Sequence, residues 1–342
     1  MRKHKIHHLR DERGIHLNNK PRDRQYNLLS LSGDWQWHDL MVDDWLSPEV
    51  EKLRMNHPYA LDWLDMLPHL KTNYISVRFP DGENPSIFGT IAYALDSTKV
   101  NGEREVQQFH YYVYKDTLIT INLDDDTWET LNKTNRMIML QQCQQAIEGL
   151  FVVTRTVLHY LHQGMDRFEC NLRELEHQME RKNHRYLMDE ILTSRFELLF
   201  WNNLFISFQE LVVASKEAYH DAFISNRFYT QLFHRVDRME RLFVHYNNEI
   251  DTLIAIDDAV SAFRGNEIMK TLTILTAVFT PATVIGAIWG MNFDIIPLAN
   301  LTWGFVGMIL LIGFTTVVIY YWLYKKGWTG DLLKVSSKEK HV

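Results

Sequence analysis

Apolar residues are distributed unevenly along the chain, and the longest apolar runs lie near its end. Within residues 268–290 nearly every residue is apolar or threonine, with Lys270 the only charge, and a second uncharged run covers residues 303–324. A helix rises ~1.5 Å per residue, so about 20 such residues cross the ~30 Å hydrocarbon core of a bilayer. The pattern predicts two transmembrane helices, 268–290 and 303–324, joined by a short loop at 291–302.

Short periodic stretches before residue 130 predict a mixed sheet flanked by helices, after a polar tail at residues 1–30. Ser47-Pro48-Glu49 is typical of a helix start, because the missing N–H of proline does no harm in the first turn. Alternating apolar and polar residues are typical of half-buried strands, and two such runs around Lys115-Asp116 are typical of a hairpin. The predicted elements are helices at 48–56 and 59–67, strands at 73–79 and 87–95, and hairpin strands at 109–114 and 118–123.

The middle of the chain has a helical pattern, and one of its predicted helices is apolar enough to be mistaken for a membrane span. That helix contains Arg195, Glu197 and Glu210. Each charge at a bilayer centre costs roughly 2.5–3.5 kcal/mol on insertion scales. We therefore expect a packed helix of an acidic cytoplasmic domain at residues 31–225. The long helices are predicted at 134–162, 166–190 and 191–220.

A stalk helix is predicted at residues 226–267 and continues into the first span. Its apolar residues recur at alternating spacings of four and three, which is a coiled-coil seam sustained for about four heptads. The seam implies self-association, or packing on the chain's own helices. Asp257 interrupts it, either as part of a carboxylate ring from several subunits or because the seam turns toward solvent. The seam residues are Leu232, Val236, Met239, Phe243, Tyr246, Ile250, Leu253, Asp257 and Val260.

One face of the first predicted span is rich in threonine. With about 100° per residue, its members fall within about 80° of one another, and Leu272 borders them. Such threonines either bond back to their own helix or line a shared polar pore. Pro281 removes one backbone hydrogen bond and permits a local bend. The face consists of Met269, Thr273, Thr276, Thr280, Thr283 and Ala287.

Charge separates the middle of the chain from its ends. Residues 1–24 carry a net +5 and residues 264–342 a net +3, which leaves −15 for residues 25–263 of the whole-chain −7. The acidic body argues against a nucleic-acid partner, because phosphate binding needs a basic surface. It suits a domain that meets cations, and an ordinary acidic soluble domain explains it equally well.

Catalytic and metal-ligating motifs are not found in the sequence. Cys143 and Cys170 have no His or Cys at metal-ligand spacing, so we expect reduced thiols in a cytosolic domain. No apolar run follows the basic N-terminus, so no cleaved signal peptide is expected. There is no phosphate loop, nucleophile elbow or metal-hydrolase spacing, so we expect neither an enzyme nor a catalytic cofactor.

Three motifs mark the first span and its loop: Asn266-Glu267-Ile268-Met269-Lys270-Thr271-Leu272-Thr273-Ile274, then Pro281, then Gly290-Met291-Asn292-Phe293. Together with the second span and its Lys-rich end, they resemble the CorA family of divalent metal ion transporters. The specific match covers about residues 264–328. The resemblance implies an α+β cytoplasmic domain, a long stalk helix and two transmembrane helices, assembled as a homopentamer.

The resemblance also implies the positions of the functional residues. Gly290, Met291 and Asn292 would form the selectivity ring of the pentamer. Met269 and Leu272 would form an apolar constriction. The pore-lining residues implied by the motif are Met269, Leu272, Thr276, Thr280 and Thr283.

The chemistry of Mg²⁺ agrees with a ring of amide oxygens. The ion holds its waters tightly, so a fast pore should bind it through those waters, and releasable binding favours neutral oxygens over carboxylates. Asn292 supplies such an oxygen, and Gly290 lets the backbone turn and approach closely. Two positions depart from the family: Trp289 replaces a common Tyr, and Ile296-Pro297-Leu298-Ala299 replaces Met-Pro-Glu-Leu. Asp294 is then the only charge of the loop, so cations outside are gathered less strongly.

The sequence therefore predicts a CorA-type channel or transporter that moves Mg²⁺ down its electrochemical gradient. The acidic domain is expected to sense the ion inside, because in the family metal bound between cytoplasmic domains favours the closed state. One rival is a Zn²⁺, Co²⁺ or Ni²⁺ transporter of the same fold, and another is a non-conducting, membrane-anchored coiled-coil scaffold. The candidate sensor residues are Asp124, Asp125, Asp257 and Asp258.

Lysines after the second span set the expected topology. The loop at 291–302 has no Lys or Arg, whereas the tail at 325–342 is basic. The positive-inside rule then predicts an external loop and cytoplasmic N- and C-termini in a two-pass protein of the cell membrane. The expected partners are membrane lipid, divalent cations and further copies of the chain.

Overall fold

The structure of the chain is a computed structural model with two compact units, Met1–Asp251 and Thr252–Val342. Each unit is described by itself. The described residues are 26–70, 72–94, 99–100, 103–104, 106–181, 187–220, 225–291 and 303–328.

A mixed six-stranded sheet forms the base of the first unit, in the order β1-β2-β8-β7-β4-β3. Strand β2 pairs with β8 in parallel, and all other neighbours in this sheet are antiparallel. The mixed sheet and the β7–β8 hairpin are confirmed. The strands are β1 (Tyr26–Ser30), β2 (Gln36–Leu40), β3 (Tyr74–Arg78), β4 (Ser86–Tyr93), β7 (Gln107–Tyr114) and β8 (Thr117–Ile121), beside a small ribbon of β5 (Lys99–Val100) and β6 (Glu103–Arg104).

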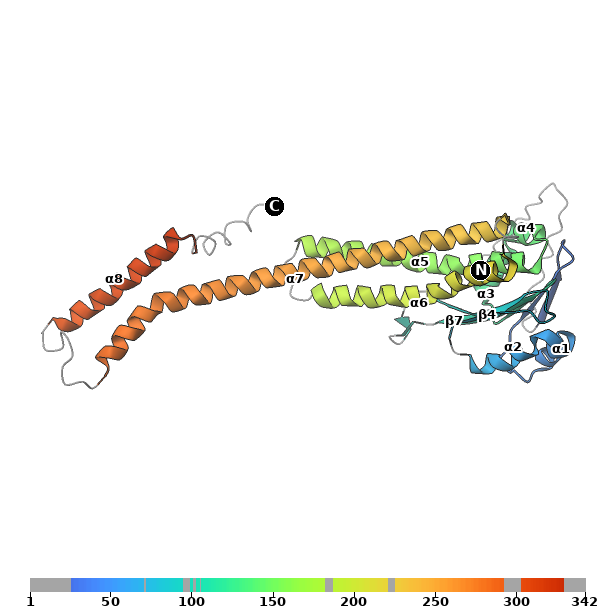
Figure 1. Ribbon diagram of the computed structural model, residues 1–342, viewed down its shortest axis with the longest axis horizontal. Coiled ribbons are helices and arrows are strands. Elements are labelled where there is room, and N and C mark those ends of the chain that lie inside the picture. The colour runs from blue at the N-terminus through green and yellow to red at the C-terminus, as the bar shows by residue number, and fades with distance from the viewer. Residues whose placement is uncertain are drawn as a thin grey trace, which may run out of the picture. The chain divides into compact units, whose positions relative to one another are not determined.

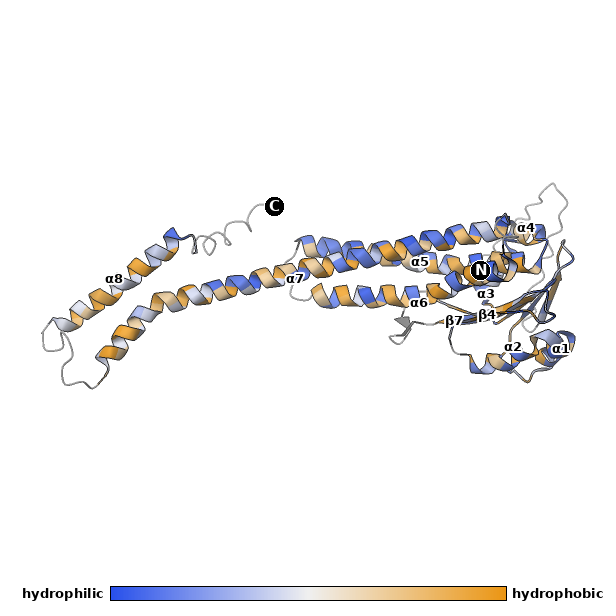
Figure 2. Ribbon diagram, viewed as in Figure 1, coloured by the Kyte–Doolittle hydropathy of each residue, from blue (hydrophilic) through white to orange (hydrophobic). Residues whose placement is uncertain are grey.

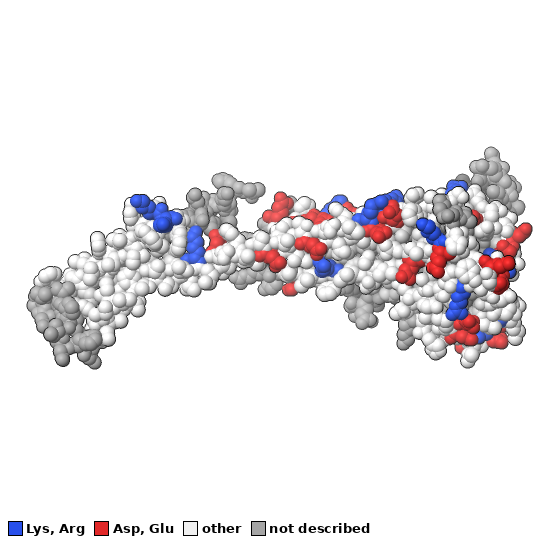
Figure 3. Space-filling view, in the orientation of Figure 1, with Lys and Arg blue, Asp and Glu red and all other residues white. Residues whose placement is uncertain are grey.

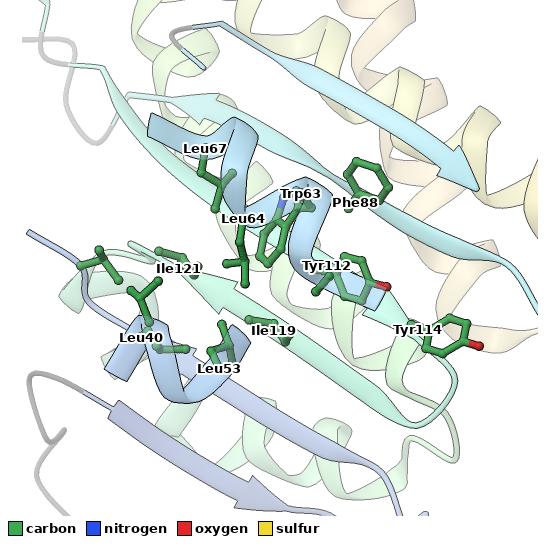
Figure 4. Close-up of a cluster of buried hydrophobic side chains, with 13 residues drawn as sticks. Leu40, Leu53, Trp63, Leu64, Leu67, Phe88, Tyr112, Tyr114, Ile119 and Ile121 are labelled. Atoms are coloured by element: carbon green, nitrogen blue, oxygen red, sulfur yellow. The ribbon is translucent and has the colours of Figure 1, made fainter. Parts of the chain in front are cut away.

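Two short helices cover one face of the sheet, α1 (Pro48–Asn56) and α2 (Leu61–Met66), with 3₁₀ turns at Pro58–Ala60 and Leu67–His69. Both helices were predicted at these positions. Trp63 of α2 is 1% exposed and lies 5.3 Å from Tyr112, centroid to centroid. Figure 4 shows these side chains meeting residues of β2, β4, β7 and β8 in one apolar cluster. Burial of such aromatic and aliphatic groups stabilises the unit by about 1.5–3 kcal/mol for each large side chain.

Long helices contact the other face of the sheet, as Figure 1 shows. Trp35, next to β2, is fully buried and donates from Nε1 to the carbonyl of Cys143 at 3.1 Å. A Cβ on Gly149 would lie 2.2 Å from Cη2 of Trp35, so only glycine lets the helix approach this ring. The helices of this layer are α3 (Asp125–Asn132), α4 (Thr134–Gln142), α5 (Ala146–Arg181) and α6 (Leu187–Tyr219).

The predicted start of the long helices at 134 and their predicted end at 220 agree with Thr134 and Tyr219 to within one residue, but the boundaries between these positions were wrong. A single helix, α5, runs through residues 163–165, where the prediction ended one helix and began another. A Cβ on Gly164 would lie 2.4 Å from Cη2 of Trp201 in α6. Glycine at this position therefore permits close helix packing and does not end the helix. The extended backbone at Cys143, which ends α4, was not predicted.

Strands β1 and β2 were also missed, and β1 occupies the last five residues of the predicted N-terminal tail. His38 and Asp39 are buried, at 5% and 0% exposure, and they interrupt the apolar alternation of β2. Thr120 Oγ1 donates to Asp39 Oδ1 at 2.8 Å, which satisfies the buried carboxylate. A buried polar pair of this kind conceals a strand from a hydrophobicity pattern.

Helix α6 is one of three helices that are long and apolar enough to cross a membrane, and 56% of its most apolar stretch is buried. Trp201, Phe205 and Phe208 are at most 1% exposed, and the helix contacts α5, β3 and β4. The expectation that this helix packs in a folded domain is confirmed.

Helix α7 (Arg227–Trp289) begins in the first unit, beside α5 and α6. Its predicted seam is buried from Leu232 to Ile250. Tyr246 lies 5.4 Å from Phe168 of α5, and Phe243 lies 5.1 Å from Phe205 of α6, centroid to centroid. In this part of the chain the seam therefore packs on the chain's own helices, which is one of the two alternatives.

Candidate ion-conduction site

The second unit contains the C-terminal part of α7 and helix α8 (Gly304–Lys325). The most apolar stretches of these two helices are only 6% buried. Figure 2 shows them strongly hydrophobic, and in Figure 3 most of their visible surface carries no charged side chain. Contiguous exposed apolar surface of this extent marks contact with lipid or with other protein. Helix α8 alone is about 33 Å long at 1.5 Å per residue, enough to cross a bilayer.

The threonine face of α7 has one consistent hydrogen-bond pattern. Thr276 donates from Oγ1 to the carbonyl of Leu272 at 2.8 Å, and Thr280 donates to the carbonyl of Thr276 at 2.6 Å. Thr273 and Thr283 make the same bond at 2.8 and 3.1 Å. The hydroxyls thus bond back to their own helix, which was one of the two alternatives for this face. A hydroxyl has one hydrogen and two lone pairs, so each oxygen keeps acceptor capacity on its exposed side.

This pattern turns the threonine face into a row of acceptors without free donors. Thr273, Thr276, Thr280 and Thr283 are all exposed in the single chain. Met269 and Leu272, which lie on the same side of the helix, are 61% and 55% exposed. The face thus begins with apolar side chains and continues with hydroxyl oxygens.

Pro281 lies inside α7, where it removes one backbone N–H from the hydrogen-bond ladder. Figure 1 shows that the C-terminal part of α7 is bent. Prolines are among the usual causes of such bends, because the ring also crowds the preceding turn. The helix continues past Pro281 to Trp289.

Gly290 and Met291 follow the last helical residue. The N–H of Gly290 donates to the carbonyls of Gly286 at 2.9 Å and Ala287 at 3.2 Å, so the helix closes with a tightened turn. Among the described glycines only Gly82 and Gly327 have positive φ, so Gly290 is not required here by a left-handed backbone. Met291 is 49% exposed. Asn292 and Asp294 lie outside the described residues.

Asp124 has a structural role in the first unit. Its Oδ1 accepts from the N–H of Thr127 at 2.7 Å, which caps the N-terminus of α3. Its Oδ2 accepts from the hydroxyls of Tyr93 and Thr127. Burial, and next the Asp124 charge, raise the pKa of Tyr93 far above its usual value, which keeps this phenol a donor. The carboxylate is therefore occupied by three donors within one chain.

Sequence reasoning did not foresee this cap. Asp124 stands directly before a helical run, which is the position where aspartate commonly accepts from the first turn. Tyr93 could not be found in this way, because it comes from a strand 31 residues earlier.

The other candidate sensor acids are exposed or half-buried. Asp125 and Asp258 are exposed, and Asp257 is half-buried. Val260, the next seam position, is 37% exposed, so the seam is no longer enclosed there. The structure does not bring Asp124 or Asp125 together with Asp257 and Asp258 in one unit. Within the described part of one chain, no three His, Cys, Asp or Glu side chains form a group that could hold a metal ion.

Comparison with known proteins adds an independent line of evidence. A family model described as CorA-like Mg²⁺ transporter protein matches residues 36–325. The chain is 30% identical over 308 residues to the magnesium transport protein CorA of Bacillus subtilis (strain 168), which covers 90% of this chain and 95% of that protein. It is 23% identical over 307 residues to the cobalt/magnesium transport protein CorA of Methanocaldococcus jannaschii, with 83% and 96% covered.

The fold is also similar to a solved structure. The complete CorA magnesium transporter from Methanocaldococcus jannaschii matches with a TM-score of 0.62 and 20% sequence identity. The match covers 86% of this chain and 91% of that chain, so it includes both units. At this identity the similarity concerns the fold.

Proposed function

The chain belongs to the family of CorA-like Mg²⁺ transporters, and on this premise we propose that it conducts Mg²⁺ down its electrochemical gradient through a pore lined by α7. As a member of this family it is a divalent cation transporter. The magnesium and cobalt/magnesium transport named for its relatives supports the proposed ion.

The threonine face of α7 is the observation that carries the proposal. A hydrated Mg²⁺ turns the hydrogens of its waters outward, so its surface consists of hydrogen-bond donors. The matching wall consists of acceptors. The hydroxyls of Thr276 and Thr280 each donate their hydrogen to a backbone carbonyl of the helix, and they retain lone pairs on the exposed side. Such a wall binds the ion weakly through its waters, which suits conduction.

Met269 and Leu272 are proposed as the apolar constriction next to this wall. Both are more than half exposed and lie at the N-terminal end of the threonine face. A ring of such side chains interrupts the water column when it is narrow, and hydrophobic constrictions gate pores in this way.

A single α7 cannot enclose a pore, so the proposal requires several copies, and the family resemblance sets their number at five. An exposed apolar stripe on α6 supports self-association. Its residues fall within about 100° of the helix, and Phe196 and Val213 are 69% and 66% exposed. An apolar stripe of this kind on a folded domain marks a protein contact. The stripe consists of Leu192, Phe196, Leu199, Ile206 and Val213.

Gly290, Met291 and Asn292 are proposed as the selectivity ring at the end of α7. Support comes from the sequence motif and from the turn that closes the helix at Gly290. In the ring, the Asn292 amide oxygen of each copy would accept from the waters of the ion.

We place both termini in the cytoplasm and the loop at 291–302 outside, in a two-pass arrangement in the cell membrane. The charge asymmetry around the two apolar helices supports this topology. Cysteine introduced at Ala299 should react with an impermeant thiol reagent in intact cells, and cysteine introduced at Ser336 should not. The reverse labelling would contradict the topology.

Feedback by internal metal is proposed to act through Asp257 and Asp258. Asp124 is occupied by the cap of α3, which leaves the two acids on α7 as the stronger candidates. Asp257→Asn with Asp258→Asn should reduce closure at high internal Mg²⁺, whereas Asp124→Asn with Asp125→Asn should retain it. Unchanged closure in both double variants would show that other acids bind the regulatory ion.

Co²⁺ is the second candidate cargo, because the Methanocaldococcus jannaschii relative is named a cobalt/magnesium transport protein. Flux into proteoliposomes across Mg²⁺, Co²⁺, Ni²⁺ and Zn²⁺ separates the candidates. We expect Mg²⁺ to enter in preference to the others. Faster entry of a transition metal would change the assigned ion, and absence of all metal flux would favour the non-conducting scaffold.

A further inference from the structure

A group of five arginines stands out in the acidic first unit. Arg227, Arg235 and Arg238 lie within about 80° on one face of α7. Arg155 lies on α5 and Arg136 on α4. We call these residues the arginine cluster. It lies in a part of the chain, residues 25–263, that carries a net −15.

Hydrogen bonds hold the cluster across three helices. Arg136 donates from Nη1 to Thr156 Oγ1 at 3.2 Å, which ties α4 to α5. Arg155 donates from Nη1 to Gln231 Oε1, which ties α5 to α7. Arg155 Nε is buried and has no hydrogen-bond partner among the described residues. A buried donor left in this state is unfavourable, so a bound acceptor would stabilise it.

The cluster is not neutralised by acids of the described part of the chain. None of its five arginines forms an ion pair there, whereas Arg241, one turn beyond Arg238, pairs with Asp237 at 2.5 Å. Glu148 lies toward one end of the cluster, and it accepts from Asn226 Nδ2 and from the N–H of Gln144. Asp166 lies toward the other end, near His162, whose pKa is lowered by burial and by the charge of Arg235 and is partly restored by the charge of Asp166.

The arginines are close enough to repel one another. Burial, followed by the charges of Arg235, Arg136 and Arg227, lowers the pKa of Arg155 to about 10. Burial and the charges of Arg136 and Arg238 also lower the pKa of Arg235. With a pKa of about 10, Arg155 still carries its charge at neutral pH. The folded unit therefore concentrates positive charge at one place, and none of these arginines forms an ion pair with its described residues.

The chemistry of the site selects a multiply charged oxyanion. Guanidinium groups match phosphate oxygens in bidentate geometry, and several guanidiniums require an anion with several charges. Arg136, Arg155 and Arg235 are half-buried and converge from three helices, which suits a small anion. We propose that the arginine cluster binds the phosphate chain of a magnesium-free triphosphate, either inorganic triphosphate or a nucleoside triphosphate.

Magnesium should weaken the binding of a phosphate chain to the arginine cluster. Mg²⁺ binds the oxygens of a phosphate chain and neutralises part of its charge. The ion and the arginines therefore compete for one ligand, and occupancy of the site falls as Mg²⁺ rises. The use of this competition as feedback rests on the proposed function, whereas the binding site does not.

Isothermal titration of the full chain in detergent tests the site, with sodium triphosphate and ATP as probes in magnesium-free buffer. We expect saturable binding that weakens about 100-fold in Arg155→Gln with Arg235→Gln, roughly tenfold for each guanidinium that is removed. Arg173→Gln with Arg241→Gln is the matched control, because these arginines lie on the same helices but are paired with Glu169 and Asp237. Equal affinity for the two probes would identify the phosphate chain as the ligand, and tighter ATP binding would identify a nucleotide.

Thermal unfolding separates binding from a purely structural role. Without an anion, Arg155→Gln with Arg235→Gln should unfold at the same or a higher temperature, since it removes repulsion. Triphosphate should raise the midpoint of the unchanged chain, and saturating Mg²⁺ should reduce that shift. Absence of saturable binding at millimolar triphosphate would overturn the proposal, as would equal binding by the double variant. A third outcome is that the unchanged chain does not bind triphosphate and the double variant no longer forms the oligomer. That outcome would also overturn the proposal, and it would assign the cluster to a contact with acidic residues of another copy. None of these measurements depends on metal flux.

Discussion

The two units satisfy their polar side chains in different ways. In the first unit, polar groups find partners far away in the sequence, such as Thr120 with Asp39 and Tyr93 with Asp124. In the second unit, Thr276 and Thr280 bond to the carbonyl four residues earlier in the same helix. The first pattern requires a folded core, whereas the second is complete within one helix.

This difference explains what surroundings each unit needs. A helix whose hydroxyls are satisfied internally can enter a medium without water, because it leaves no unpaired donor there. The first unit instead encloses its polar pairs between a sheet and helices, and it exposes charge on the surface that Figure 3 shows. The second unit therefore suits a membrane and a pore, and the first suits an aqueous compartment.

Replacement of Asn292 should have the largest effect on the function proposed for the second unit. Asn292→Ala removes the amide oxygen from every copy at once, and an apolar ring cannot replace water-bonding oxygens, so Mg²⁺ flux in proteoliposomes should be abolished. Size-exclusion chromatography should show an intact oligomer. Asn292→Asp should bind cations more tightly but conduct Mg²⁺ poorly, since tight binding slows release. Full flux in the alanine variant would eliminate the selectivity ring.

The acceptor wall can be tested by removal of its oxygens without a change of shape. Thr276→Val with Thr280→Val should lower Mg²⁺ flux about tenfold or more, which corresponds to about 1.4 kcal/mol in the barrier. Thr271→Val is the matched control: Thr271 makes the same bond, to the carbonyl of Glu267 at 2.8 Å, but points about 200° away from Met269. A loss of the same size in the control would mean that helix stability, and not the pore face, depends on these hydroxyls.

Close packing in the first unit should be sensitive to one methyl group. Gly164→Ala places a Cβ about where Trp201 lies, and overpacking of this kind destabilises by about 1–3 kcal/mol. Gly265→Ala, in α7, is the control because its Cβ would meet nothing within 4 Å. It should be neutral or slightly stabilising, since alanine favours helix. Thermal unfolding in detergent measures both, and equal midpoints would contradict the tight α5–α6 contact.

Mild acid should produce the smallest effect, and only in the first unit. Burial lowers the pKa of His110 to about 4, and burial together with His57 lowers that of His38 to about 4. Both side chains stay neutral in the fold but protonate near pH 6.5 when unfolded. Their contribution is complete above about pH 6.5 and is lost as pH falls toward 4. The thermal unfolding midpoint should decrease less between pH 7 and pH 5 in His110→Gln than in the unchanged chain. His245→Gln, at an exposed position, should leave this decrease unchanged. An unchanged slope in His110→Gln would contradict a neutral buried imidazole.

The strands and short helices that were predicted correctly have simple local patterns. Helix α1 follows a Ser-Pro-Glu start, and the β7–β8 hairpin surrounds a polar turn with Lys115 at φ 52°. Strand β2 was missed because His38 and Asp39 are buried polar residues, and the prediction divided α5 at residues 163–165, where Gly164 approaches Trp201 of α6 closely. In both β2 and α5, a partner that is distant in the sequence determined the structural role of the residue.

For the candidate site, the sequence by itself determined the family, the apolar helices and the spacing of the threonine face. These properties are local or periodic, so the order of residues is sufficient to define them. The tertiary structure alone decided that Asp124 caps α3 with Tyr93 as a donor, and that Arg155 lies within electrostatic range of Arg136 and Arg235 on other helices. Burial and charge depend on which distant segments become neighbours, and folding establishes those neighbours through packing that no single segment contains.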